Sequence, residues 1–457
     1  GDEPVHAFGS SPQNILTYLP KGNGNNISDW VDWTAKFGIN HVRSYPPSIK
    51  VSEPAQNIFE KSHENPNKFD LDRYNQKYFD ELRKACQLLR KNGFIVHLQL
   101  WQAVYWKRYW GNNYYNPKNN INPDISKHAA PKEFVTMKNS TLLNHQKQYV
   151  IKILDATGDI GNVFYDIMNE IGNGTGISEP WVWEIIKVIN EWEDQSGYDV
   201  HVTLNDEGGK RMGDFSLECP GLDLIIKDLG RYDEHTEAKR KYNKPSISVR
   251  NIDYNYELNE RFYFFGENNL EVNIDSILQT RGRKYWWRMF MSGVQIGGGY
   301  ADSYLIKNIS WYVNKVSSKL GIPKFLSNKR KASFRLNLVA ENNFVNFKNF
   351  VNQIGGYCQL IPSNEILQGH PVENSYILQS ENQAVIYLES PNGMAGFNYP
   401  STDAKLSGLI LADGLWTGSF YFPATGKSSK FTIRIESGEG DLNLPAFQDD
   451  LAIYIRQ

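Results

Sequence analysis

The segment Asn162-Val163-Phe164-Tyr165-Asp166-Ile167-Met168-Asn169-Glu170 decides which fold this sequence is expected to adopt. Its core from Val163 to Met168 is a short, mostly apolar run, which is typical of a strand buried on both faces in a parallel sheet. Helices are predicted on either side, at 143–154 before the run and at 181–192 after it. A strand between two helices predicts βαβ units and therefore an α/β fold.

The same alternation continues outward from this segment. Upstream, helices precede predicted strands at 39–43 and 94–100, and Asn92-Gly93 is a stop signal for the second helix. Downstream, further strands are predicted at 200–204, 222–227 and 294–296. Repetition of these units predicts a (β/α)8 TIM barrel.

After residue 355 the pattern changes to short alternating segments separated by turn residues. Segments such as 383–388 and 430–435 are typical of a β-sandwich, and Ile386, Leu388 and Ile433 are expected to face its interior. A chain of 457 residues is long enough for one large domain and one of ordinary size. We therefore predict a catalytic barrel at 1–355 and a small all-β sandwich at 356–457.

The composition argues against several classes of partner. The chain has 49 basic and 51 acidic residues and a net charge of -2, so it carries no electrostatic footprint for nucleic acid or an anionic membrane. Its three cysteines lie far apart and its nine histidines form no H-x-H or H-E-x-x-H pattern, so neither a disulfide scaffold nor a metal site is indicated. We expect no cofactor, and the oligomeric state stays open. Because the sequence begins with Gly-Asp-Glu-Pro rather than Met, we expect a secreted or periplasmic protein.

Polar side chains at predicted strand ends form the candidate site. The reactive groups of a (β/α)8 barrel lie at the C-terminal ends of its strands, where the βα loops converge. Glu170 falls at such an end, directly after an apolar strand and beside Asn169. Its alternative role is to cap the next helix, since carboxylates also favour helix N-termini. Other predicted strand ends also carry polar or aromatic residues, which favours a site there. These residues are Arg43, Gln99, Trp101 and Asn205.

Three features carry a family resemblance: Val42-Arg43, the segment 162–170 and the aromatic loop after the third strand. In them the chain, over roughly residues 5–350, resembles glycoside hydrolases of clan A. The resemblance implies that Glu170 is the general acid/base, that Asn169 binds a sugar 2-hydroxyl and that Arg43 orients the nucleophile. It also implies a carbohydrate substrate, hydrolysed at an O-glycosidic bond with retention through a covalent glycosyl-enzyme. A catalytically silent barrel that only binds carbohydrate is the alternative, and another chemistry on this fold is a third.

The second carboxylate is expected at the end of the seventh strand. Many clan members place this Glu five residues after a Lys-Pro pair, but here Lys244-Pro245 leads to Arg250, which cannot attack a sugar. Both 246–249 and 261–265 look like strands. We interpret 244–254 as an insertion and the apolar run 261–265 as the seventh strand, which makes Glu267 the predicted nucleophile. The alternatives are Asp253, Glu257 and a Glu267 that is only a solvated loop acid.

The loop at 101–115 is rich in aromatic rings: Trp101, Tyr105, Trp106, Tyr109, Trp110, Tyr114 and Tyr115. Rings at this density either stack on sugars or pack into a small lid core. Both alternatives stay open. The residues predicted to contact the substrate, besides Arg43 and Asn169, are Gln99, Trp101, Trp106, Asn205 and Tyr232.

The C-terminal segment carries a second resemblance. Gly356-Tyr357-Cys358 and the stretch from Trp416 to Gly426 resemble the collagen-binding-type domain that follows some barrel hydrolases of apiosidase type. The resemblance implies a structural role, shielding one side of the barrel, ahead of carbohydrate binding. Collagen binding is not expected.

Overall fold

The computed structural model describes the chain in ranges, and these are 8–10, 27–28, 31, 40–47, 56–103, 106, 109–171, 178–205, 215–227, 236, 241–242, 244, 246–248, 283–284, 286–293, 295–299, 343, 345–363, 374–389, 398–399 and 405–457. The chain forms two compact units, called here the N-terminal unit, Ala7–Leu229, and the C-terminal unit, Gly230–Gln457 with Gly1–His6. The domain boundary between 355 and 356 stays a prediction. No helix among the described residues is long and apolar enough to span a bilayer.

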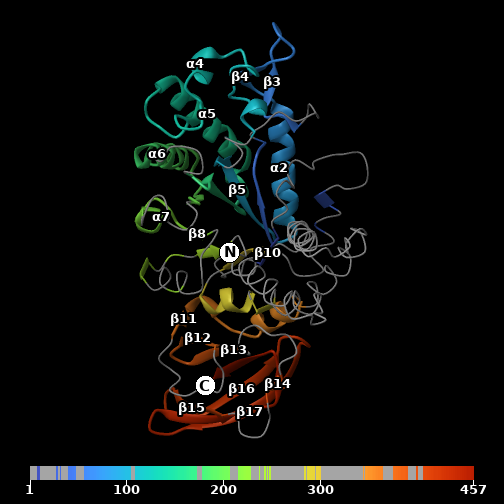
Figure 1. The fold of residues 1–457 in the computed structure, drawn as a ribbon, viewed down its shortest axis with the longest axis vertical. Helices are drawn as coiled ribbons and strands as arrows, with labels where there is room; N and C mark the ends of the chain where they lie inside the picture. The colour runs from blue at the N-terminus through green and yellow to red at the C-terminus, as the bar shows by residue number, and fades with distance from the viewer. Residues whose placement is uncertain are drawn as a thin grey trace, which may run out of the picture. The chain divides into compact units, whose positions relative to one another are not determined.

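A parallel sheet organises the N-terminal unit (Figure 1). Its strands pair in the order β1-β2-β5-β6-β7, each parallel to its neighbour. The bounds are β1 (Phe8–Ser10), β2 (His41–Ser44), β5 (Ile95–Gln102), β6 (Val163–Asn169), β7 (His201–Thr203) and, next in the chain, β8 (Ile225–Lys227). A parallel bridge between Asn205 and Ile226 joins the end of β7 to β8.

Helices alternate with these strands, as the sequence pattern predicts. The helices are α2 (Gln76–Lys91), α4 (Pro123–Ser126), α5 (Ser140–Thr157), α6 (Glu179–Ser196) and α7 (Phe215–Glu218), and a hairpin of β3 (Phe59–Lys61) and β4 (Phe69–Tyr74) precedes α2. From α5, the Tyr149 hydroxyl donates to the Leu100 carbonyl at 3.2 Å. The hydroxyls of Thr157 and Tyr165 lie 2.8 Å apart. Because side chains alternate along a strand, Tyr165 facing α5 places Asp166 on the opposite face of β6.

Local sequence explains where these helices begin and end. The Asn139 side chain accepts a hydrogen bond from the Leu142 N–H at 2.7 Å and so caps the start of α5. Helix α2 ends at Lys91 with Asn92 as its C-cap, and Gly93 follows with φ at 75°. Glycine adopts this left-handed conformation without a steric penalty, so the predicted stop signal is confirmed.

Two short strands of the C-terminal unit complete the α/β part of the fold. Strand β9 (Ser246–Ser248) pairs in parallel with β10 (Gln295–Gly299). In chain order, the six parallel strands described in the N-terminal unit and these two give a TIM-barrel-like α/β fold, which confirms the predicted fold class.

The position of β9 corrects one interpretation of the sequence. Residues 244–254 were expected to be an insertion, but Ser246–Ser248 within them form the strand beside β10. Backbone pairing with a distant strand decides which segment enters a sheet, whereas the apolar run 261–265 shows only local side-chain composition. Residues 261–265 themselves lie outside the described residues.

An antiparallel β-sheet region ends the chain. Its six-stranded sheet has the order β11-β12-β13-β20-β16-β17, and two two-stranded sheets pair β14 with β19 and β15 with β18. The bounds are β11 (Ile361–Pro362), β12 (Asn374–Ser380), β13 (Gln383–Glu389), β14 (Asn398–Tyr399), β15 (Lys405–Ile410), β16 (Gly414–Phe422), β17 (Lys427–Ile435), β18 (Glu439–Asn443), β19 (Phe447–Gln448) and β20 (Asp450–Arg456). Ile386, Leu388 and Ile433 lie in one buried apolar cluster, as predicted for its interior.

The opposite face of β13 and β20 contacts helical residues at 283–284 and 286–291. The rings of Trp287 and Tyr387 stack with centroids 5.2 Å apart and 9° between their planes. Arg283 donates to both carboxylate oxygens of Asp450, from Nη2 to Oδ1 at 2.8 Å and from Nε to Oδ2 at 2.9 Å. Aromatic stacking and a bidentate ion pair therefore join this helical segment to the C-terminal sheet within one unit.

Candidate active site

Glu170 lies at the end of β6 in an unusual backbone conformation. Its φ is 52°, and its side chain is buried with only 2% of its surface exposed. A non-glycine residue in the left-handed region costs on the order of 1–3 kcal/mol, and such residues cluster at functional sites. Helix α6 begins at Glu179 and has Ser178 as its N-cap, so Glu170 is not the capping acid of that helix.

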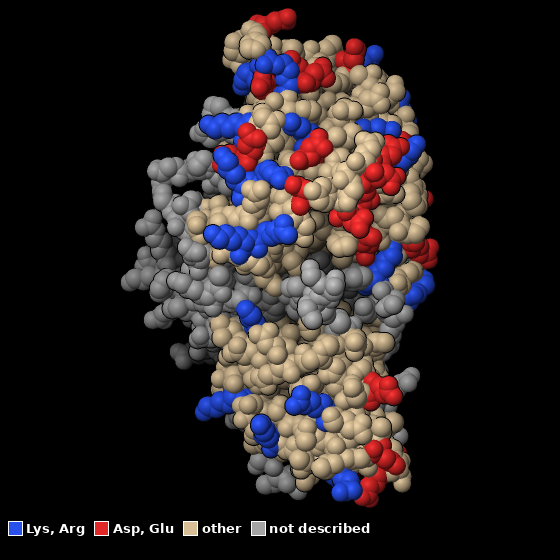
Figure 2. All heavy atoms as spheres, turned by 180° about the vertical axis from the view of Figure 1, so that it is seen from behind, with Lys and Arg blue, Asp and Glu red and all other residues tan. Residues whose placement is uncertain are grey.

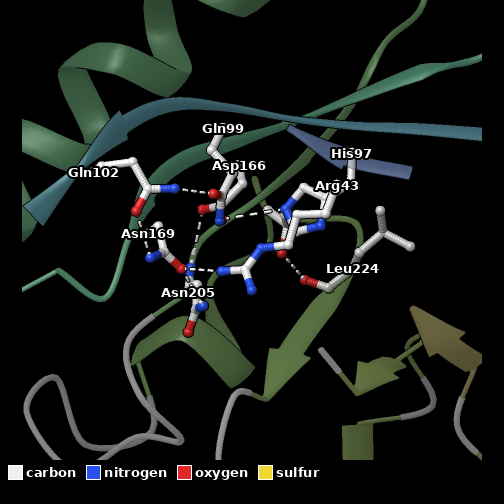
Figure 3. A network of polar contacts seen from close by, with 9 residues as sticks. Arg43, His97, Gln99, Gln102, Asp166, Asn169, Asn205 and Leu224 are labelled. Carbon is white, nitrogen blue, oxygen red and sulfur yellow. Dashed lines mark hydrogen bonds and ion pairs between the residues drawn. The ribbon is translucent and has the colours of Figure 1, made fainter. Parts of the chain in front are cut away.

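Asn169, directly before Glu170, is held from three strands (Figure 3). Its Oδ1 accepts a hydrogen bond from Arg43 Nη2 on β2 and another from Asn205 Nδ2, 2.7 Å away, just after β7. Its Nδ2 donates to Gln102 Oε1 on β5 at 2.8 Å. The side chain therefore has a fixed orientation at the strand ends.

A chain of hydrogen bonds runs from Asn169 back to a buried carboxylate. Gln102 Nε2 donates to Gln99 Oε1, and Gln99 Nε2 donates to Asp166 Oδ2 at 2.9 Å. The same oxygen lies 3.2 Å from His97 Nε2. The Asn205 N–H donates to the other oxygen, Asp166 Oδ1, at 3.1 Å. Asp166 is completely buried, and a carboxylate in that position needs such donors to be stable.

The structure brings together four of the residues predicted to bind substrate: Arg43, Gln99, Asn169 and Asn205. It adds three residues that the sequence reasoning missed, namely His97, Gln102 and Asp166. A signal for two of them was available, because His97 and Asp166 share strand faces with predicted site residues at a period of two. His97 and Asp166 lie within their strands rather than at the ends where a barrel places reactive groups, and Gln102 lies two residues beyond the strand predicted at 94–100.

The aromatic loop packs into a protein core. Trp106 is completely buried, its Nε1–H donates to the Ala129 carbonyl at 3.1 Å, and its ring centroid lies 4.0 Å from that of Phe134. Trp101 contacts Trp181 with centroids 5.6 Å apart. A ring face that protein covers cannot stack on a sugar, so the described residues favour the lid core. Substrate contact by Trp101 and Trp106 gains no support from this arrangement.

Several predicted residues lie outside the described part of the chain: Tyr232, Asp253, Glu257 and Glu267. Their roles stay predictions, and the strand argument for Glu267 no longer holds, because β9 lies at 246–248. Within the described ranges, no group of three or more His, Cys, Asp or Glu side chains could hold a metal ion.

Charge on the described surface has both signs, and Figure 2 shows Lys and Arg side chains together with Asp and Glu on one face. The exclusion of nucleic-acid and membrane partners stays a prediction.

The chain has a TIM-barrel-like α/β fold, and nearly its whole length is structurally similar to solved structures of glycoside hydrolases. A glycoside hydrolase family 5 structure from Bacteroides vulgatus ATCC 8482 is 12% identical, with a TM-score of 0.57 over 99% of this chain and 89% of that one. The catalytic domain of GH30 xylanase C from Talaromyces cellulolyticus is 9% identical, with a TM-score of 0.50 over 100% of this chain and 97% of that one. At these identities the likeness shows the fold alone. No protein-family model matches the sequence, and no curated protein matches it.

Proposed function

We propose that this protein is a retaining glycoside hydrolase that cleaves an O-glycosidic bond in a poly- or oligosaccharide. One observation carries the proposal: a buried glutamate with positive φ stands at the end of β6, directly beside an asparagine fixed by Arg43 and Asn205. A strained acid among positioned donors is the arrangement that general acid/base catalysis needs.

In the proposed reaction Glu170 donates its proton to the leaving glycosidic oxygen while a second carboxylate attacks the anomeric carbon. The C–O bond to the leaving group breaks and a covalent glycosyl-enzyme forms. Glu170, now a carboxylate, then takes a proton from water, whose oxygen displaces the enzyme carboxylate. Two inversions give net retention, and the two carboxyl groups of such enzymes stand about 5–5.5 Å apart.

Asn169 and Arg43 support this chemistry from the side of the sugar. Asn169 Oδ1 is used by Arg43 and Asn205, and one N–H is used by Gln102, which leaves its second N–H to donate to a sugar hydroxyl. The guanidinium of Arg43 would orient the attacking carboxylate.

The second carboxylate is proposed between β9 and β10. Glu267 remains our choice, with Asp253 and Glu257 as alternatives. Replacing the nucleophile by Ala abolishes hydrolysis, and added azide then restores release of an activated leaving group as the glycosyl azide of inverted configuration. Comparison of the three Ala variants identifies which position responds to azide.

Glu170→Gln tests the acid/base assignment. Because general acid catalysis contributes about 100- to 10,000-fold, hydrolysis of substrates with poor leaving groups should fall by that factor. The first step should be spared for activated aryl glycosides, whose leaving group needs no proton. Glu179→Gln, at an exposed position at the start of α6, is the matched control and should be fully active.

The substrate panel should include plant, algal and host glycans, because we also propose a secreted or periplasmic location. Equal loss by Glu170→Gln on both kinds of substrate, or no loss on either, contradicts the assignment. A wild type that binds glycans without cleaving any of them is the outcome expected of a silent carbohydrate-binding barrel.

A further inference from the structure

We propose that Asp166 is a positioning residue: through a one-directional relay of three side-chain amides it acts with Arg43 to fix which atoms Asn169 can offer to a substrate. The amide relay consists of Gln99, Gln102 and Asn169. The hydrogen bonds of the relay do not depend on any assigned activity, whereas their catalytic consequence rests on the glycosidase function proposed above.

A chain of amides can in principle run in two directions. Each amide has one oxygen, which accepts, and one NH2 group, which donates, so reversing every member gives an equally continuous chain. The groups at the two ends remove this ambiguity. At one end the Asp166 carboxylate only accepts, and at the other the Arg43 guanidinium only donates.

Both ends select the same direction. Asp166 draws the NH2 group of Gln99, so Gln99 Oε1 faces Gln102 and accepts from it. Gln102 Oε1 then accepts from Asn169 Nδ2 at 2.8 Å, which turns Asn169 Oδ1 toward Arg43. Figure 3 follows this sequence of bonds across β5 and β6.

Burial prevents the amides of the relay from reversing their hydrogen bonds. The exposed fractions are 0% for Asp166, 1% for Gln99, 4% for Gln102 and 3% for Asn169, so water has little access to replace a missing partner. An amide that flips would oppose NH2 to NH2 or oxygen to oxygen, and leaving buried polar groups unpaired is costly.

The relay therefore determines the character of Asn169. Its oxygen accepts from Arg43 and Asn205, and one of its two N–H groups is engaged by Gln102. The group left for a substrate is a donor, which suits a hydroxyl oxygen. Asp166 contributes to this outcome together with Arg43 and Asn205, without touching Asn169 directly in any of the described hydrogen bonds.

Asp166→Asn keeps the shape but removes the acceptor-only end. The new amide can donate to Gln99, so only the Arg43 end still selects the direction, and the presentation of Asn169 is held less firmly. Gln99→Met breaks the first link while leaving the Asp166 carboxylate in place. Tyr165→Phe is the structural control, because it removes a buried hydroxyl contact from the other face of β6.

The first measurement needs no substrate. In 15N-TROSY spectra of protein labelled at Asn and Gln side chains, Asp166→Asn and Gln99→Met should both shift the NH2 resonances of Asn169, and Tyr165→Phe should not. If the Asn169 resonances keep their wild-type positions in Asp166→Asn and Gln99→Met, the relay is overturned. Far-UV circular dichroism establishes that each variant is folded.

The second measurement tests the catalytic consequence. Probes are 2,4-dinitrophenyl β-glucoside and its 2-deoxy analogue, or the matching pair for another sugar that the wild type cleaves. Because hydrogen bonds to the 2-hydroxyl strengthen in the transition state, the ratio of kcat/KM between the pair should fall about tenfold or more in Asp166→Asn and Gln99→Met. Tyr165→Phe should keep the wild-type ratio.

The outcomes separate the relay from the proposed function. Equal loss on both probes, with the ratio intact, means that Asp166 has only a structural role and overturns the positioning claim. If the wild type cleaves no glycoside of the panel, the proposed function fails, and the Asn169 resonances alone decide whether the relay exists.

Discussion

Trp287→Ala should destabilise the C-terminal unit strongly, because this ring joins the helical residues 286–291 to the C-terminal sheet. The ring is completely buried and stacks on Tyr387 at 5.2 Å. It also contacts Phe350, at 4.7 Å between centroids, and Phe347, at 5.1 Å. Truncation to Ala removes these three ring contacts and a fourth, with Tyr421 at 6.2 Å.

The expected magnitude follows from burial. A buried aromatic side chain removes about 150–250 Å² from water, which at about 25 cal/mol per Å² corresponds to roughly 4–6 kcal/mol. Measured Trp→Ala substitutions in cores cost about 3–5 kcal/mol, because the site partly collapses. We therefore expect a loss of about 4 kcal/mol for Trp287→Ala, a large share of the roughly 5–15 kcal/mol that stabilises a typical domain.

Trp287→Phe is the matched control. Among the described residues the indole Nε1 of Trp287 has no hydrogen-bond partner, so Phe loses none of the described polar contacts and keeps a ring for Tyr387. Its cost should stay below about 1.5 kcal/mol, as for other conservative apolar exchanges. The assay is urea unfolding followed by hydrogen exchange of the β13 peptide 383–389. If Trp287→Ala costs less than about 1 kcal/mol there, the helical segment is not stabilised by this sheet.

Two further predictions concern the N-terminal unit. Burial lowers the pKa of His145 to about 4, below the value of about 6.5 in the unfolded chain, so the unfolded state binds more protons between these values. Stability present at pH 7 should therefore be lost as pH falls from about 6.5 to 4, by on the order of 3 kcal/mol, and unfolding curves of His145→Gln should lack this slope. A Cβ on Gly158 would lie 2.2 Å from the Trp192 ring, so Gly158→Ala should lose about 1–3 kcal/mol by overpacking. Gly111→Ala, with nothing within 4 Å of the added Cβ, should unfold like the wild type, and equal melting of the two variants would contradict the packing argument.

The periodicity of apolar residues in the sequence predicted most of the α/β fold. Local features can be recognised directly from the sequence. They include the apolar run at β6, the helices around it and the Asn92-Gly93 stop. Both 246–249 and 261–265 look like strands in the sequence, and the wrong one was chosen as the seventh because Ser246-Ile247-Ser248 is short and weakly apolar. Its place in a sheet depends on pairing with Gln295 and its neighbours, which no local pattern records.

The candidate site likewise contains residues that the sequence predicts and contacts that it does not. Glu170, Asn169 and Arg43 were predicted because they end strands, where the fold places reactive groups. The burial of Trp106 could not be predicted, since it depends on Phe134 and Ala129, which are remote in sequence. The hydrogen-bond direction through Gln99 likewise exists only once three strands are assembled.

The polar face of the N-terminal sheet itself argues for a functional site. In TIM barrels the strand faces away from the helices are dominated by bulky branched apolar residues that fill the barrel. Here polar and charged side chains are buried on that face, namely His41, Arg43, His97, Gln99 and Asp166. Burying them opposes stability unless each finds partners, and the positive φ of Glu170 opposes it again. Asp166 on this face is linked through Gln99 and Gln102 to Asn169, beside Glu170, so both departures from what the fold alone would favour adjoin the site that we propose.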